Sequence, residues 1–99
     1  MRVQRTEEFV DWFDSLTVKD QAQVDARLQR IEQYEHFGDA KDLGDGLAEL
    51  RWMSGRRVYF TRVADDHGRL VLVLLGGMKN AQKKDIKQAR LLVRKYAGA

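Results

Sequence analysis

Three cationic side chains in the second half of the chain have the types and spacing that bind phosphate. Arg51 and Arg57 flank a short polar segment around Ser54, and Lys79 follows the apolar run 70–75 and two glycines. Guanidinium groups donate paired hydrogen bonds to phosphate oxygens, and an ammonium group adds a compact positive charge. These residues predict a site for a polyanion.

Strand alternation predicts how the two arginines lie relative to each other. If a β-hairpin folds about Ser54, Arg51 lies opposite Arg57 and Glu49 lies opposite Tyr59 on the same face. Adjacent arginines repel each other unless water or an anion separates them, so a phosphate between them is one interpretation. The alternative is that both arginines are solvated or paired with Glu49 and nearby acids.

The segment after Lys79 combines helical spacing with positive charge. Apolar residues recur at helical intervals: Ile86, Ala89, Val93 and Tyr96. The opposite face carries Lys83, Lys87, Arg90 and Arg94. Residues 79–99 hold seven Lys or Arg and one Asp, whereas residues 1–78 hold eleven basic and fourteen acidic side chains. This local basic surface favours a polyanionic partner, although such a face is also typical of the solvated side of an amphipathic helix.

Composition narrows the class of protein. The 99 residues predict a single domain, residues 1–99, with one core. Absence of cysteine excludes disulfides, and no His/Asp/Glu spacing or glycine-rich phosphate loop predicts a metal or cofactor, so we expect none. The start, MRVQRTEEFVDWF, has acids where a signal peptide is apolar, and no apolar stretch is long enough for a bilayer. We therefore expect a cytoplasmic location and no membrane partner.

The elements that must position these residues follow an α+β pattern. Residues 3–5 predict a short strand, and Thr6 and Thr17 are N-cap candidates for two successive helices. Residues 36–46 are rich in glycine and aspartate and predict a loop. Three further strand candidates and the final helix complete the order β-α-α-β-β-β-α: 47–52, 57–63 and 70–75. We expect a small, mostly antiparallel sheet with the apolar strand central, while the partner of the first strand stays open.

Four blocks, in this order and spacing, carry a family resemblance. They are FVDWFDSL, RLQRIEQYEHFGDAKDLGDGLAELRW, SGRRVYF and LLGGMKNAQKKDIKQAR. Together they resemble the RelE/ParE superfamily of bacterial type II toxins, in particular its HigB-like "addiction module killer" branch, which is related to phage Gp49 proteins. Two positions depart from the usual pattern. Arg56 replaces an aromatic residue, which adds positive charge at the expected site, and Met78 replaces an aspartate.

The resemblance implies a RelE-like fold and a role as the toxin of a two-gene toxin–antitoxin module. For the HigB-like branch it implies a metal-independent endoribonuclease, or mRNA interferase, that cuts mRNA on the ribosome, inhibits translation and arrests growth. The implied partner is a HigA-like antitoxin with a helix-turn-helix domain, and operator DNA is contacted only through the toxin–antitoxin complex.

Within this resemblance we assign site roles from the chemistry that RNA cleavage needs. Arg51, Arg57 and Lys79 are candidates for clamping the substrate and stabilising charge on the phosphorane. Glu49 and Lys79 are alternative general bases, and Tyr59 is a candidate for stacking on a base or donating to the leaving oxygen. Gln82 and the cations of the last helix are expected to contact RNA: Lys83, Lys87, Arg90 and Arg94.

Two other functions remain open at this point. A ParE-like member would inhibit DNA gyrase by binding it, without catalysis, and such a protein needs no phosphate clamp. A domain that kept only the fold would be a non-catalytic module that binds nucleic acid or protein. The paired arginines with Lys79 favour the nuclease. Arg27, Arg30 and Gln23 form a further polar stripe on the second predicted helix, which either meets ribosomal RNA or is simply solvated.

Overall fold

The computed structural model describes residues 1–98 and has three α-helices and five β-strands within them. The first half contains β1 (Arg2–Arg5), α1 (Glu7–Asp14), α2 (Val18–Tyr34) and β2 (Ala40–Gly44). The second half contains β3 (Leu47–Arg51), β4 (Arg56–Asp65), β5 (Gly68–Met78), the 3₁₀ turn η1 (Lys79–Ala81) and α3 (Gln82–Ala97). The predicted α+β class is confirmed.

The five strands form one sheet in the order β1-β5-β4-β3-β2. Strand β1 runs parallel to β5, which settles the partner that the sequence left open, and the other pairs are antiparallel. The apolar strand β5 is interior, between β1 and β4, but β4 is the middle strand. The loop predicted over 36–46 is wrong in part, because residues 40–44 pair with β3 as the edge strand β2.

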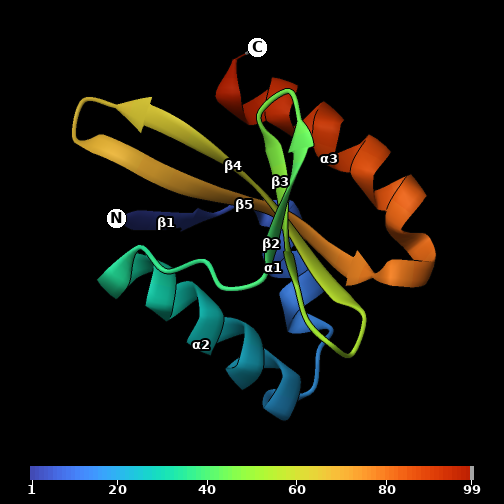
Figure 1. The fold of residues 1–99 in the computed structure, drawn as a ribbon. Coiled ribbons are helices and arrows are strands. Elements are labelled where there is room, and N and C mark those ends of the chain that lie inside the picture. Colours follow the sequence, from blue (N-terminus) through green and yellow to red (C-terminus); the bar gives the residue numbers. More distant parts are fainter. Residues whose placement is uncertain (99) are drawn as a thin grey trace.

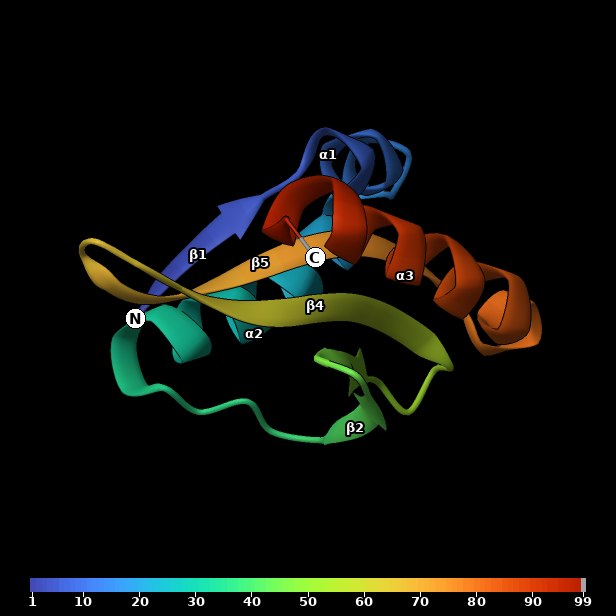
Figure 2. The ribbon, with the colours of Figure 1, turned by 90° about the horizontal axis from the view of Figure 1, so that it is seen from above.

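Helices cover both faces of the sheet, so the protein has three layers (Figure 1, Figure 2). Helices α1 and α2 pack on one face around a core that includes Phe9, Leu28 and Phe60. Helix α3 packs on the other face over Tyr59 and the leucines of β5. Because β5 is covered on both sides, residues 70–74 are buried without interruption, as the apolar run predicted.

Both predicted helix caps are present. The Thr6 hydroxyl accepts a hydrogen bond from the Phe9 amide at 3.1 Å and itself donates to the Leu74 carbonyl at 2.9 Å. The Thr17 hydroxyl accepts from the Asp20 amide at 3.2 Å. A threonine at each N-cap satisfies an amide that the first helical turn leaves without a partner. Thr6 also fixes the start of α1 to the sheet.

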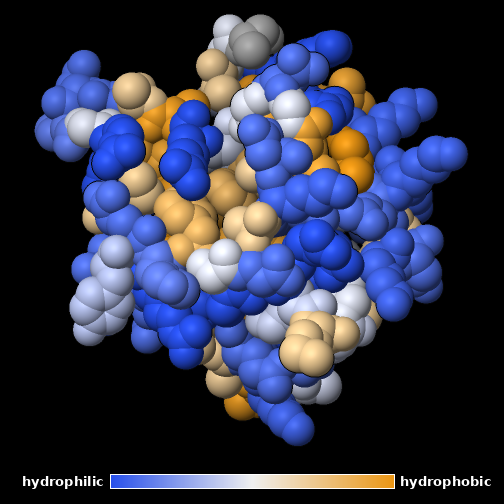
Figure 3. Space-filling view, in the orientation of Figure 1, coloured by the Kyte–Doolittle hydropathy of each residue, from blue (hydrophilic) through white to orange (hydrophobic). Residues whose placement is uncertain are grey.

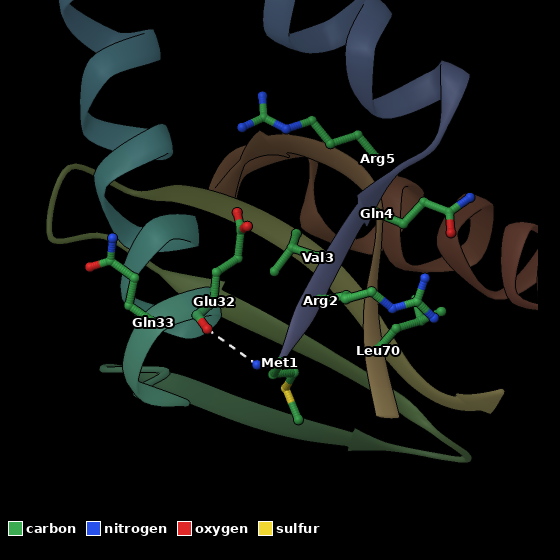
Figure 4. A pocket seen from close by; sticks show the side chains of 8 residues that line it. All are labelled: Met1, Arg2, Val3, Gln4, Arg5, Glu32, Gln33 and Leu70. Atoms are coloured by element: carbon green, nitrogen blue, oxygen red, sulfur yellow. Dashed lines mark hydrogen bonds between the residues drawn. The ribbon is translucent and has the colours of Figure 1, made fainter. Parts of the chain in front are cut away.

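Two hollows lie away from the predicted phosphate site. A hollow of about 470 Å³ is lined by the β2–β3 hairpin together with Phe60, Thr61 and Arg62 of β4, and Figure 3 shows apolar residues gathered beside this hairpin. Another, of about 640 Å³, lies between β1 and the end of α2, where the Met1 amino group donates to the Glu32 carbonyl (Figure 4). Within residues 1–98, every helix is too short or too polar to span a lipid bilayer.

Candidate phosphate-binding site

The β3–β4 hairpin has the register that strand alternation predicts. Arg51 pairs with Arg57, and Glu49 pairs with Tyr59. All four side chains lie on the sheet face that α3 covers, since the Tyr59 ring belongs to the core cluster beneath that helix. Residue 57 also pairs with Gly77 of β5, which brings the end of β5 next to the arginines.

The Glu49 carboxylate is the buried centre of this group. Its side chain is 1% exposed, and both oxygens accept hydrogen bonds from the Gln82 amide nitrogen, at 2.7 and 3.0 Å. One oxygen also lies 3.7 Å from Nε of Arg57 and 3.9 Å from Nε of Arg51. A single carboxylate is therefore shared by two guanidinium groups, which is the alternative that the sequence left open.

The two arginines differ in how far they reach the surface. The Arg57 side chain is 9% exposed, and its Nη1 donates to the carbonyls of Trp52 at 3.3 Å and Arg56 at 3.0 Å. The Arg51 side chain is 39% exposed. Arg51 can therefore meet a ligand directly, while Arg57 lies behind it and is held by the turn of its own hairpin.

Lys79 lies at the same end of the sheet. Its amide donates to the Gly55 carbonyl at 2.8 Å, and its aliphatic stem packs along the Gly55 backbone at 3.3–3.6 Å from where a β-carbon would be. Gly55 has φ of +99°, so glycine suits this turn both in conformation and in the space it leaves for lysine. Figures 1 and 2 show the hairpin turn and the start of α3 together at this end.

Tyr59 is buried rather than available to a base at the surface. Its ring is fully enclosed, and its hydroxyl has no hydrogen-bond partner among the described residues. Burial, with the negative charges of Glu49 and Asp85, raises the pKa of Tyr59 to about 12 against the opposing effect of Arg57. The hydroxyl therefore stays protonated at neutral pH and is a spare donor inside the site.

The predicted basic face of α3 is only partly free. Lys83, Lys87 and Arg94 are exposed. The Arg90 guanidinium instead donates to the carbonyls of Leu43 at 2.9 Å and Gly44 at 3.1 Å, so it connects α3 to the end of β2. Gln82 likewise points inward to Glu49 and not to the solvent.

Arg56 does not add charge to the site, contrary to the prediction. It lies on the α1/α2 side of the sheet, where it pairs with Asp20 at 2.9 Å and donates to Gln23 at 3.1 Å. Strand alternation could have predicted this position, because neighbouring residues of a strand point to opposite faces of the sheet and Arg57 faces α3.

Arg27 also has a structural role that its place in a polar stripe did not reveal. It donates to the carbonyls of Phe37, Asp39 and Arg51, and its guanidinium lies 4.4 Å from the centre of the Trp52 ring. Burial lowers the pKa of Arg27, with Asp39 opposing this effect and Arg30 adding to it. Arg27 therefore ties α2 to the β3 end of the site.

The geometry of the site supports binding of an anion. The partly exposed Arg51 and the exposed Lys79 lie at one sheet end, beside the first turn of α3, whose free amides also favour negative charge. Arg57 adds positive charge from behind. Within residues 1–98, no group of three or more His, Asp or Glu side chains is arranged to hold a metal ion.

The fold is that of the RelE toxins. The chain superposes on a mutant of the Escherichia coli toxin RelE in the free state with a TM-score of 0.68 at 14% identity, covering 96% of each chain. The intact E. coli RelBE toxin–antitoxin complex gives 0.62 at 16% identity, over 78% of this chain and 94% of that one. The YoeB/ParE toxin from Agrobacterium tumefaciens gives 0.63 at 13% identity, over 79% and 98%. At these identities the likeness shows the fold.

The family is shown at the level of sequence. Residues 11–96 match the family described as phage derived protein Gp49-like (DUF891), and the chain belongs to that family. It is also 40% identical over 95 residues to a protein of Haemophilus influenzae (strain ATCC 51907 / DSM 11121 / KW20 / Rd) described as an uncharacterized protein, covering 93% of this chain and 92% of that one. The relation to phage Gp49 proteins that the sequence blocks predicted is confirmed.

Proposed function

We propose that this protein is the toxin of a bacterial toxin–antitoxin module and that it cleaves mRNA on the ribosome in the cytoplasm. The RelE fold supports the toxin role. The observation that carries the nuclease role is the pairing of Arg51 with Arg57 beside Lys79 at one end of the sheet. A clamp of this kind suits a phosphodiester, because guanidinium and ammonium groups stabilise charge on phosphate oxygens.

In the proposed reaction, the 2′-hydroxyl attacks the adjacent phosphorus and the 5′-oxygen leaves, which gives a cyclic phosphate end. Arg51 and Lys79 contact the phosphate oxygens, and Arg57 supplies positive charge from within the protein. These donors lower the barrier by meeting negative charge as it develops on the phosphorane. The exposed Lys83, Lys87 and Arg94 extend the cationic surface along the RNA.

The general base must reach the 2′-hydroxyl directly or through one water molecule. Of the two predicted candidates, Glu49 is enclosed and has both oxygens engaged, whereas Lys79 is exposed. This favours Lys79 as the base, which requires its neutral amine form: the amine takes the 2′-hydroxyl proton, the ammonium group so formed meets the charge on the phosphorane, and water donates a proton to the departing 5′-oxygen. Glu49 is left for a role inside the protein.

A cognate antitoxin is the proposed protein partner. The E. coli structure with the same fold is a toxin–antitoxin complex, which supports this assignment. We propose a HigA-like helix-turn-helix antitoxin, as the sequence blocks suggest, with operator DNA contacted through the complex.

The competing function is inhibition of DNA gyrase, since the fold is shared with a YoeB/ParE toxin. The two functions differ in what the cations must do. A nuclease needs Arg51 and Lys79 at the phosphate, whereas a gyrase inhibitor needs no such clamp.

The test is expression without the antitoxin in cells, followed by mapping of mRNA ends and a reporter of DNA damage. We expect growth arrest with mRNA cleaved in translated regions, and Arg51→Ala and Lys79→Ala should each reduce cleavage about 10²–10³-fold. Lys19→Ala, which removes an exposed cation from α2 on the opposite face of the sheet, is the matched control and should cleave normally. Arrest with DNA damage and intact mRNA would instead identify a gyrase inhibitor.

A further inference from the structure

A fully enclosed carboxylate lies between the two arginines of the proposed site. We infer that Glu49 is a positioning residue, which holds Arg51 and Arg57 side by side and offsets part of their charge so that they meet the phosphate in one fixed arrangement. This inference rests on the proposed function and gives that site an internal counter-ion.

The burial of the Glu49 carboxylate requires partners that compensate for its lost hydration. An unpaired buried carboxylate costs several kcal/mol, so such groups are found with ionic and hydrogen-bonding partners. Glu49 has these partners from three directions, namely Gln82 of α3 and one arginine from each strand of the hairpin. The negative charge of Glu49 therefore lies between the positive charges of Arg51 and Arg57, which would otherwise repel each other.

The contacts also show which part of each arginine is used. Glu49 approaches the Nε atoms of Arg51 and Arg57, at 3.9 and 3.7 Å. These distances are those of ion pairs and not of hydrogen bonds, and neither Nε has a hydrogen-bond partner within residues 1–98. Among these described residues, the Nη atoms of Arg51 also lack a hydrogen-bond partner. Glu49 thus restrains the base of each guanidinium group and leaves donors of Arg51 for a ligand.

Gln82 connects this arrangement to the helix. Its amide nitrogen donates to both oxygens of Glu49, which fixes the plane of the carboxylate. Gln82 is the first residue of α3, directly after the 3₁₀ turn that contains Lys79. The Gln82 side chain therefore connects the turn that presents Lys79 to Glu49, the residue that orients the arginine pair.

A positioning role predicts a combination of effects that a structural role would not produce. Glu49→Gln keeps the size of the side chain and can still bond to Gln82, but it removes the negative charge. The site then gains one unit of positive charge, so RNA should bind more tightly, while the arginines lose their fixed arrangement. We expect KM for RNA to fall severalfold and kcat to fall at least tenfold, with a salt slope of binding steeper by about 0.7 if one more phosphate is neutralised.

The decisive comparison is with Glu49→Gln/Gln82→Glu, which returns a carboxylate to the same enclosed site from the helix side. We expect this double variant to recover kcat in part and to return KM toward that of the wild-type protein. Gln88→Ala, at an exposed position of α3, is the control and should match the wild type. Unchanged KM and kcat in Glu49→Gln would overturn the inference. A different result would also overturn it and would identify Glu49 as the base: kcat falls while KM stays the same, the double variant gives no rescue, and the acidic limb of the pH profile is lost.

A second measurement does not depend on nuclease activity. The Nε–H signals of Arg51 and Arg57 in ¹⁵N NMR spectra should be shifted and slow to exchange in the wild-type protein, and should move toward those of solvated arginine in Glu49→Gln. If wild-type protein cleaves no RNA but shows these signals, the proposed function fails and the ion-pair arrangement stands. If Glu49→Gln does not fold, Gln82→Ala should move the same signals, and unmoved signals there would overturn the inference.

Discussion

The carboxylate of Asp85 lies where a side chain of Gly77 would be. A β-carbon on Gly77 would collide with an Asp85 oxygen, so glycine at the end of β5 allows the first turn of α3 to close onto the sheet. Burial raises the pKa of Asp85, and the neighbouring Lys84 opposes this shift only in part. Asp85 thus carries a cost of burial next to the proposed phosphate site.

The first prediction is that Asp85→Asn stabilises the protein at pH 7. A carboxylate with a raised pKa in the folded state destabilises that state when it is ionised, so the neutral amide removes a penalty. As the pH falls through the raised pKa, the wild-type carboxyl takes up its proton and the advantage of the variant shrinks. It should be lost below the pKa of the unfolded chain, about 4. Denaturant midpoints at pH 7 and pH 3.5 measure this.

Asp14→Asn is the matched control for this prediction. Asp14 is exposed at the end of α1, and its neutralisation should change the midpoint little at either pH. A lower midpoint for Asp85→Asn at pH 7 would show that Asp85 contributes a net favourable contact, contrary to the prediction.

The second prediction concerns Gly76, which is buried beneath the Trp12 ring. An added β-carbon would lie inside the ring's van der Waals envelope, so Gly76→Ala forces Trp12 or β5 to move. We expect a loss of about 1–3 kcal/mol in the free energy of unfolding. The double variant Gly76→Ala/Trp12→Leu should lose less than the sum of the two single variants, because the smaller side chain leaves room for the methyl group. Strict additivity would contradict the proposed clash.

The hairpin register shows what the sequence could predict and why. Arg51 opposite Arg57 follows from the two-residue period of a strand and from a turn at Ser54, which are both local properties. The buried run of β5 and the threonine caps are local as well, and all of these predictions are confirmed.

What the sequence did not reveal depends on contacts between distant residues. Residues 40–44 have the composition of a loop, and they become β2 because β3 supplies a partner for their backbone groups. The burial of Glu49 depends on Gln82, 33 residues away, which the strand pattern does not contain. The strand pattern made Glu49 a candidate base, but it could not show the contact with Gln82 that helps to enclose its carboxylate.

The third prediction compares Arg56 and Arg51, and distinguishes a residue that stabilises the fold from one that acts in the proposed site. Arg56→Ala should destabilise the protein by about 2 kcal/mol, because it removes a buried guanidinium from Asp20 and Gln23. The loss should be smaller than for a fully buried pair, since the Asp20 side chain is 35% exposed. Arg51→Ala should change stability by less than about 1 kcal/mol but abolish most RNA cleavage. Thermal unfolding and a cleavage assay on the same preparations test this, and a larger stability loss at Arg51 would contradict it.

The fourth prediction is a loss of stability in acid that depends on Glu8. Its carboxylate accepts from the Tyr96 hydroxyl at 2.6 Å and from the Lys95 ammonium at 2.9 Å, and these bonds lower the pKa of Glu8 to about 2 from an ordinary 4.5. A lowered carboxyl pKa stabilises the folded state fully above the unfolded value, and this stabilisation is lost as the pH falls from about 4.5 to about 2. Glu8→Gln should therefore be less stable than the wild type at pH 7, with the difference closing across that range.

Glu7 provides the comparison for this effect, because it is the exposed neighbour of Glu8 in the first turn of α1. Glu7→Gln removes the same charge from the same helix end, and therefore the same favourable interaction with the helix dipole, but it leaves the bonds to α3 intact. The difference between the two variants isolates the link from α1 to the end of α3. Midpoints of urea unfolding at pH 7, 4 and 2.5 measure it, and equal losses in the two variants at pH 7 would show that the helix dipole, and not this link, lowers the pKa of Glu8.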